Sequence, residues 1–409
     1  GVHTAFSGNH LHFAERVFTG IRLLGGGELL LPGELRLAPG ETYTGPLVYG
    51  VHGTGLDAVA RRFHGVLRAR KRRLSTRRPV TYNVWEAVYM DHSLPKLLRL
   101  ADLAAGVGVE RFVLDDGWFG ARRHEHAGLG DWVVSDDAWP DGLSPLIDRV
   151  NELGMEFGLW FEPEMVNPDS DVAREHPDWI LSARTSWPVE SRFQQVLNLS
   201  IPEAYAHVRD QMMALLDAYP IAYIKWDHNR DLVDAGDQTR GGRPAVHEQT
   251  LAYYRLLDEL REAHPELEIE SCSSGGARVD LEVLQRTDRV WVSDCIDPLE
   301  RQVMNRWTAQ LIPLEYMGNH IASRHSHTTG RRHDIGRQPR DGLDLAEGRS
   351  ARTEGVQNAR QRPAHSRRPT LKTATAASQA TVRLSASPNS VQRMPISRFC
   401  AARVATHGV

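Results

Sequence analysis

The sequence predicts an α/β fold centred on an incomplete (β/α)8 barrel of the TIM type, because three observations agree. Between residues 79 and 333, short β-rich runs alternate with amphipathic helical stretches, which is the pattern of repeated βα units. Residues 1–50 alternate apolar and polar side chains around glycine-rich turns, which predicts antiparallel strands. Two β-rich runs end in an aspartate, Asp227 and Asp294, and parallel barrels carry their reactive groups at the C-terminal ends of strands.

Seven strands are expected in the barrel, one fewer than a closed barrel needs. They are TYNVW (81–85), RFVLDD (111–116), EFGLWFEP (156–163), YIKWD (223–227), EIESCSS (268–274), RVWVSD (289–294) and PLEYMG (313–318). Helices are expected between them at about 93–108, 145–154, 204–220 and 246–264, and a further helix in the linker 51–78. A longer insertion, residues 167–200, predicts a hairpin over the mouth of the barrel.

Composition excludes several classes of protein. A formal net charge of -3 argues against a polyanion-binding protein, so no nucleic-acid partner is expected. No apolar run approaches the roughly 20 residues of a membrane span. The three cysteines, Cys272, Cys295 and Cys400, lie far apart without the spacing of a disulfide framework or a zinc site, which favours the cytoplasm.

Both ends of the sequence suggest a fragment of a longer protein. The chain opens at Gly1 inside a strand-like pattern, without a signal peptide. Residues 334–409 contain no Trp or Tyr and carry 13 Lys and Arg against 5 Asp and Glu, so they cannot build an apolar core. We expect a disordered, basic, low-complexity tail there, with no eighth strand.

The motifs of the barrel region identify a family resemblance. In order along the chain they are YNVWEAVY, FVLDDGWFG, GLGDW, FGLWFEPEMVNP, RFQQVLNLS, YIKWDHNR, ESCSSGGAR and WVSDCIDPLER. From residue 1 to about 334 the sequence resembles the family 36 glycoside hydrolases, most of which are α-galactosidases. The resemblance implies four parts: 1–50, the end of an N-terminal β-sandwich; 51–78, a helical linker; 79–333, the catalytic barrel; and 334–409, the tail. Because the family pattern stops abruptly after His333, we favour a shifted reading frame over a genuine tail.

The resemblance implies a retaining α-galactosidase that hydrolyses terminal α-galactosides of the raffinose or melibiose type. The reaction would pass through a covalent galactosyl-aspartate and needs no cofactor and no metal. The partner would be a small oligosaccharide, and the full-length parent could form a homo-oligomer. Two alternatives stay open: a galactosyl-transferring relative of the raffinose-synthase type, and an inactive truncated fragment.

Asp227 and Asp294 are the catalytic pair that the resemblance implies, as nucleophile and acid/base respectively. Lys225 lies two residues before Asp227 on the same strand face, where its charge would lower the pKa of that carboxyl group and keep it ionised. Apolar surroundings and the neighbouring carboxylate would raise the pKa of Asp294 and keep it protonated. The alternative for either residue is an aspartate that caps the next helix.

Sugar-binding residues follow from the same resemblance. Asp115 and Asp116 match a pair that binds the 4- and 6-hydroxyls of galactose, although adjacent strand residues face opposite sides, so one of them could be structural. Trp160 and Trp85 match residues that line the pocket and its entrance, with a core role as the alternative for each. Arg192 matches a sugar-contacting arginine of the insertion.

Cys272 matches a cysteine near the 2-hydroxyl, and the glycines after it allow a close approach of the backbone to the ligand. A buried, unreactive thiol is the alternative. Glu162 and Glu164 are further carboxylates at a strand end, to which we assign no proton transfer. The histidines His325, His327 and His333 fit no standard metal site, and we reject that reading.

Overall fold

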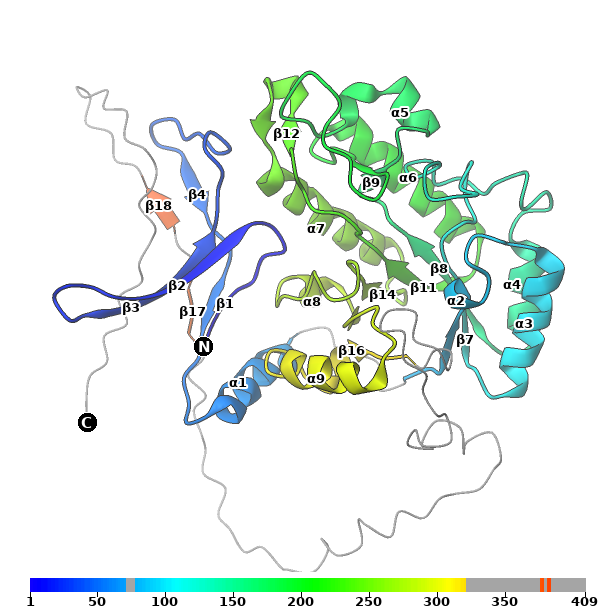
Figure 1. Ribbon diagram of the computed structural model, residues 1–409, viewed down its shortest axis with the longest axis horizontal. Helices are drawn as coiled ribbons and strands as arrows, with labels where there is room; N and C mark the ends of the chain where they lie inside the picture. Colours follow the sequence, from blue (N-terminus) through cyan, green and yellow to red (C-terminus); the bar gives the residue numbers. More distant parts are fainter. Residues whose placement is uncertain (71–77, 321–375, 379–380, 384–409) are drawn as a thin grey trace, which may run out of the picture.

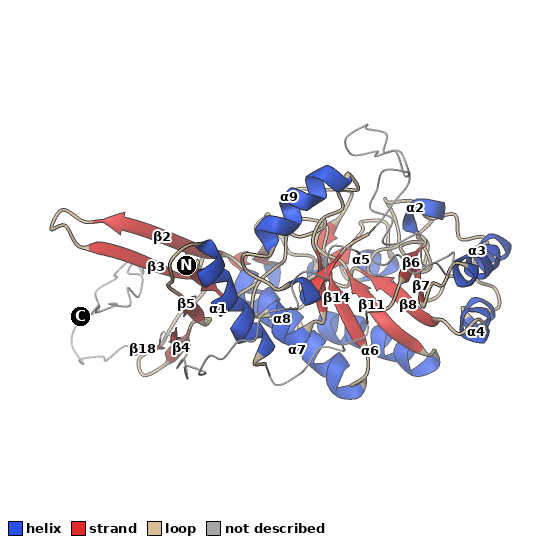
Figure 2. Cartoon of the chain, turned by 90° about the horizontal axis from the view of Figure 1, so that it is seen from below, coloured by secondary structure: helices blue, strands red, loops and turns tan. Residues whose placement is uncertain are grey.

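The computed structural model describes residues 1–70, 78–320, 376–378 and 381–383 (Figure 1). An antiparallel β region lies at one side of the molecule, and a curved parallel sheet with its helices forms the larger part. The helices α6 (Pro202–Ala218) and α7 (Val246–Ala263) run along one face of the parallel sheet (Figure 2).

The seven predicted barrel strands are all present, in sequence order and all parallel. They are β6 (Thr81–Asn83), β7 (Arg111–Leu114), β8 (Glu156–Phe161), β11 (Ile221–Trp226), β14 (Glu268–Ser271), β15 (Arg289–Trp291) and β16 (Met317–Gly318). Within the described ranges β16 and β6 are the two ends of the sheet, so the barrel is open, as the sequence predicted.

The four connecting helices expected from the sequence are also confirmed. They are α3 (Leu94–Gly106), α4 (Ser144–Glu152), α6 and α7. The linker forms α1 (Leu56–Arg68), and shorter helices are α2 (Trp85–Val88), α5 (Asp171–Glu175), α8 (Val283–Arg286) and α9 (Pro298–Thr308). Each long helix buries an apolar stripe, such as Leu97, Ala101 and Ala104 of α3, which explains why the 3.6-residue period predicted them. No helix among the described residues is long and apolar enough to cross a membrane.

The insertion after β8 forms the expected hairpin in part. Strands β9 (Met165–Val166) and β10 (Gln195–Val196) pair antiparallel, with α5 and a short 3-10 helix between them. Just before β10 the chain reverses between Ser191 and Gln194. The two central residues, Arg192 and Phe193, have φ of 54° and 59°, the left-handed geometry of a type I′ turn that side chains other than glycine rarely adopt. The turn therefore holds Arg192 in a strained but defined place.

The N-terminal strands are antiparallel, as expected from their alternation. They are β1 (Val2–Thr4), β2 (His10–Arg16), β3 (Arg22–Glu28), β4 (Thr42–Thr44) and β5 (Val48–Gly50). Two short strands were not predicted: β17 (Ala376–Ser378) pairs with β5, and β18 (Thr381–Arg383) pairs with β4. The prediction of a disordered tail otherwise falls outside the described residues.

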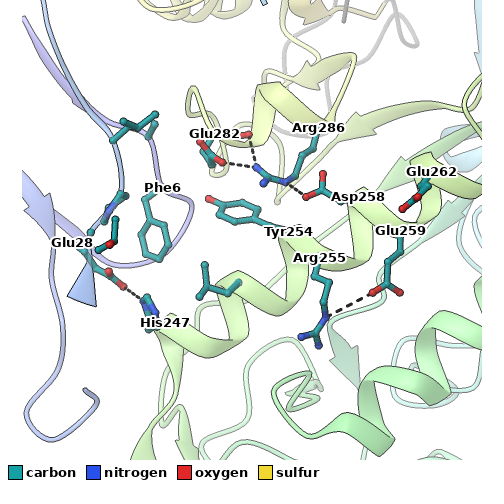
Figure 3. A pocket seen from close by; sticks show the side chains of 16 residues that line it. Phe6, Glu28, His247, Tyr254, Arg255, Asp258, Glu259, Glu262, Glu282 and Arg286 are labelled. Atoms are coloured by element: carbon teal, nitrogen blue, oxygen red, sulfur yellow. Dashed lines mark hydrogen bonds and ion pairs between the residues drawn. The ribbon is translucent and has the colours of Figure 1, made fainter. Parts of the chain in front are cut away.

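The β region and the barrel meet along α7, where Figure 3 shows a cleft between them. His247 Nδ1 lies 2.7 Å from Glu28 Oε1, and the backbone N–H of Ser7 donates to the Tyr254 hydroxyl over 2.6 Å. The Ser7 hydroxyl donates to Asp280 over 2.7 Å. These polar contacts anchor the chain before β2 against the barrel.

An ionic layer fills the barrel interior at the N-terminal ends of the strands. Arg111 lies 2.7 Å from both Glu156 and Glu268, and Arg289 lies 2.8 Å from Glu268. At the open edge Arg78, just before β6, donates to the carbonyls of Glu315 and Met317, so a side chain links the two ends of the sheet.

We predict that Arg111→Leu destabilises the fold by about 3 kcal/mol, because it leaves the partly buried carboxylates of Glu156 and Glu268 without the buried cation that they share. Arg149→Leu is the matched control, since Arg149 makes its ion pairs with Asp102 and Glu152 on the exposed surface and should change stability little. Urea unfolding of both variants measures the difference. Equal effects would contradict a structural role for the ionic layer.

Candidate active site

Asp227 follows directly on β11 and is buried among hydrogen-bond donors. Its Oδ1 accepts the backbone N–H of His228 over 2.9 Å, and its Oδ2 accepts the indole N–H of Trp160 over 3.2 Å. The Asn229 side chain and the Cys272 thiol also hydrogen-bond this carboxylate. Asp227 caps no described helix, so the capping alternative is wrong for this residue.

The donors around Asp227 determine its charge. Burial alone would raise the pKa of Asp227, but the positive charge of Lys225 and the hydrogen bonds hold it below its ordinary value. Burial would likewise lower the pKa of Lys225, yet Asp115 and Asp227 raise it well above its ordinary value. The two residues therefore stay charged together at neutral pH. The charge of Lys225 thus lowers the pKa of Asp227, as the sequence predicted.

Asp294 lies at the rim of the site, after β15. The indole N–H of Trp291 donates to its Oδ1 over 2.8 Å. Partial burial of the carboxyl group, and then the negative charge of Asp227, raise the pKa of Asp294. The following helix, α9, is capped by Asp297 and not by Asp294, so the capping alternative is wrong here too. The two aspartates are thus coupled carboxyl groups with pKa values shifted in opposite directions.

The loop after β14 packs against the segment that carries Asp294. A Cβ atom at Gly275 would come within 2.9 Å of the Asp294 backbone nitrogen, and one at Gly276 would overlap the Val292 carbonyl. These glycines therefore permit contact between two strand-end loops, whereas the sequence suggested contact with a ligand.

Asp115 and Asp116 have different partners, as expected for adjacent residues on a strand. Asp115 Oδ2 accepts from Lys225 Nζ over 2.9 Å and from Asn83 Nδ2 over 2.5 Å, which places Asp115 on the same side as Asp227. Asp116 instead forms a buried bidentate pair with Arg122, at 2.9 and 2.8 Å. Asp116 is consequently held by a cation that the sequence analysis did not single out.

Trp160 and Cys272 line the buried side of the Asp227 carboxylate. Trp160 is 2% exposed and stacks on Phe119 with ring centroids 6.1 Å apart, so it is both a core residue and a donor to Asp227. Burial and the charge of Asp227 raise the pKa of the Cys272 thiol well above its ordinary value. The thiol therefore stays protonated, and a protonated thiol is a poor nucleophile.

Arg192 and Trp85 stand at the mouth. The exposed Arg192 donates to the Ser274 hydroxyl over 3.3 Å, and its positive charge acts on Asp294. Trp85 is half-buried and packs edge to face on Tyr89, with centroids 5.1 Å apart. The structure thus brings all nine predicted site residues to the C-terminal ends of the strands. Their roles in sugar binding stay predictions.

Asn229, which was not predicted from the sequence, is the centre of the site's hydrogen-bond network. Besides its bond to Asp227, the Asn229 backbone N–H donates to Glu162 Oε1 over 2.5 Å, and its side-chain oxygen accepts from the Ser274 backbone over 3.2 Å. Glu162 also accepts from Gln194 over 3.2 Å. The only signal in the sequence was the position of Asn229 two residues after Asp227.

The two additional glutamates differ in charge. Burial and then the negative charge of Asp227 raise the pKa of Glu162 to about 8, so it is largely a neutral acid at pH 7. Glu164 forms a buried pair with Arg278, at 2.7 and 3.1 Å, and its pKa is lowered although burial opposes the shift.

No metal is implied by the described part of the chain, where no group of three or more His, Cys, Asp or Glu side chains could hold an ion. The histidines His325, His327 and His333 lie outside the described residues.

Comparisons with known proteins identify the family of the chain. The profile of the Melibiase family matches residues 42–339. The α-galactosidase of Escherichia coli is 46% identical over 337 residues, which cover 82% of this chain and 47% of that protein. The α-galactosidase AgaA of Geobacillus stearothermophilus is 38% identical over 302 residues, covering 72% of this chain and 41% of that protein.

Solved structures give the same result. The crystal structure of AgaA, described as a GH36 α-galactosidase, matches with a TM-score of 0.77 at 32% identity, covering 85% of this chain and 52% of AgaA. AgaA variants have been solved with raffinose and with stachyose. The chain therefore belongs to the Melibiase family, among the family 36 glycoside hydrolases. It spans about half the length of the curated relatives that it matches.

We predict that Glu162→Gln changes how stability depends on pH. The folded protein retains a proton on Glu162 up to a pKa of about 8, whereas the unfolded chain loses it near the ordinary value of 4.5. Wild-type stability should therefore fall as pH rises between these values, and the variant should lack that loss. Chemical unfolding from pH 5 to 8 measures the difference.

Glu164→Gln is the matched control from the same segment. Because the pKa of Glu164 is lowered in the fold, its stabilising contribution should be present at neutral pH and disappear as pH falls. A constant difference between Glu162→Gln and wild type across the range would contradict the neutral state of Glu162.

Proposed function

We propose that the chain is a retaining α-galactosidase that releases terminal α-galactose from oligosaccharides of the raffinose and melibiose type. The observation that carries the proposal is the coupled pair Asp227 and Asp294, whose pKa values are shifted apart by their surroundings. Where the surroundings shift the pKa values of two carboxyl groups apart, the group with the lower pKa is the ionised nucleophile and the group with the higher pKa is the acid. The complexes of AgaA variants with raffinose and stachyose support the substrate class.

In the first step the Asp294 carboxyl group would donate its proton to the glycosidic oxygen while an Asp227 oxygen attacks the anomeric carbon. The bond from that carbon to the leaving oxygen breaks, and a galactosyl ester of Asp227 forms. In the second step the Asp294 carboxylate takes a proton from water, and the water oxygen displaces Asp227. Galactose leaves with the original anomeric configuration, and both carboxyl groups return to their starting states.

The remaining residues would bind and orient the sugar. Asp115, fixed by Lys225 and Asn83, offers a carboxylate oxygen to sugar hydroxyls beside the nucleophile. A carboxylate in this place would favour galactose, because an epimer leaves a buried acceptor without its donor. Arg192, held by its turn and Ser274, would contact the sugar from the Asp294 side. Trp85 and Tyr89 would form an apolar wall at the entrance.

Asp116, Trp160 and Cys272 would act from the pocket wall. Asp116 is charge-paired with Arg122, and Trp160 and Cys272 donate to the nucleophile, so each also shapes the pocket without the sugar. The reaction would take place in the cytoplasm, as the cysteine usage suggests, and oligomer formation would belong to the longer parent protein.

The test is hydrolysis of raffinose and of p-nitrophenyl α-galactoside by the purified chain. Asp227→Asn should lower kcat/KM for both substrates at least about a thousandfold, because no nucleophile remains. Asp231→Asn is the matched control: Asp231 is exposed, lies four residues further along the same segment, and should leave hydrolysis close to wild type.

A folded wild-type chain that hydrolyses neither substrate would contradict the proposal and favour the inactive-fragment alternative, in which the open barrel edge leaves the site incomplete. Equal losses in Asp227→Asn and Asp231→Asn would reject Asp227 as nucleophile. Formation of longer galactosides in place of free galactose would favour the galactosyl-transferring alternative.

A further inference from the structure

A second cavity, here called the rear cavity, lies beside the segment that follows β11. Its volume is about 660 Å³, and neither Asp227, Asp294, Asp115 nor Trp160 lines it. Its walls come from the segment after β11, the loop after β14, helix α7 and the chain at residues 7–9. The size falls in the range of about 300–1,000 Å³ typical of sites for small molecules.

One wall of this rear cavity carries a buried nitrogen without a partner. His228 is 8% exposed, and its Nε2 makes no hydrogen bond within the described residues. Glu164 Oε2 lies 3.9 Å from it, beyond hydrogen-bond distance. A buried imidazole nitrogen is costly to leave unpaired, and it can donate or accept according to its tautomer.

The charges around the rear cavity balance. Glu164 and Asp231 are the acidic residues of its lining, and Arg230 and Arg278 are the basic ones. Arg278 is paired with Glu164. Arg230 donates to the carbonyls of Val189 and Gln194 at 3.1 and 2.7 Å, so its guanidinium is occupied by the protein. No uncompensated charge remains to attract an ionic ligand.

The rest of the lining consists mainly of neutral hydrogen-bonding groups. Its hydroxyl and amide side chains are Ser7, Asn9, Ser191, Asn229, Gln249, Thr250, Tyr253, Ser273 and Ser274. Several of these groups already bond within the protein: Ser7 to Asp280, Gln249 to Leu197 and Leu199, and Thr250 to Val246. The buried Tyr253 hydroxyl, like His228 Nε2, has no hydrogen-bond partner among the described residues, and such atoms match a ligand that carries hydroxyl groups. The cleft of Figure 3 differs, because its charged side chains already pair with one another: Glu28 with His247, Arg286 with Asp258, and Arg255 with Glu259.

We propose that the rear cavity is a second carbohydrate site, which binds a neutral sugar unit against His228, apart from the catalytic pocket. The bound sugar would share a wall with the catalytic site. Asn229 and Ser274 line the cavity, and the same residues hold Asp227 and Arg192. Binding at the rear is therefore coupled to the placement of the nucleophile.

The test uses D-glucose, because a catalytic pocket selective for galactose should bind it poorly. The chain is labelled on its histidine rings, and the His228 resonance is assigned by its absence in His228→Met. Added glucose should shift this resonance saturably in wild type and in Asp115→Asn, because Asp115 does not line the rear cavity. Ala277→Phe, which places a ring from an exposed position of the lining into the cavity, should abolish the shift while the His228 resonance stays visible.

Three results would overturn the proposal. The absence of a saturable shift would mean that the cavity holds only water. A shift lost in Asp115→Asn but kept in Ala277→Phe would place the glucose in the catalytic pocket. Stronger binding of glucose 6-phosphate than of glucose would reject a neutral ligand. Because the readout is binding, failure of the hydrolysis assay leaves this test unaffected.

Discussion

The charge of Lys225 inside the barrel is the interaction on which the site depends. Its ammonium group donates to Asp115 and lowers the pKa of Asp227, and these carboxylates in turn keep Lys225 charged despite its burial. Removing one member of such a buried group usually costs about 3–5 kcal/mol, because the others remain desolvated without a counter-charge. The charge of Lys225 therefore holds the Asp115 carboxylate by an ion pair and keeps Asp227 ionised.

The pKa of Asp294 follows from the same arrangement. Lys225 and Arg192 both oppose the rise in its pKa, but burial and the ionised Asp227 outweigh them. A single negative charge beside a protonated acid is the state that the first step of the proposed reaction requires. Burial and the negative charge of Asp227 also keep Glu162 neutral. Glu162 accepts hydrogen bonds from the Asn229 backbone and the Gln194 side chain.

Local patterns in the sequence predicted the seven strands and the connecting helices, whereas the nine site residues were implied by the family resemblance. Alternation along β11 was enough to put Lys225 and Asp227 on one face, because side chains repeat every two residues in a strand. The sequence could not reveal contacts made between loops, such as Asp116 with Arg122 or Glu162 with Asn229. Strands β17 and β18 were missed because their three-residue segments have no periodicity to detect. The open edge between β16 and β6 was predicted by the strand count, whereas the Arg78 link across it was not.

The most direct test of this account is an NMR titration of the aspartate carboxyl carbons, with the resonances of Asp227 and Asp294 assigned from their Asn variants. The account predicts that Asp227 titrates below the ordinary value of about 3.9 and Asp294 above it, with each step visible in the other's resonance. A reversed order, or two independent titrations near the ordinary value, would contradict the division of roles between the two carboxyl groups.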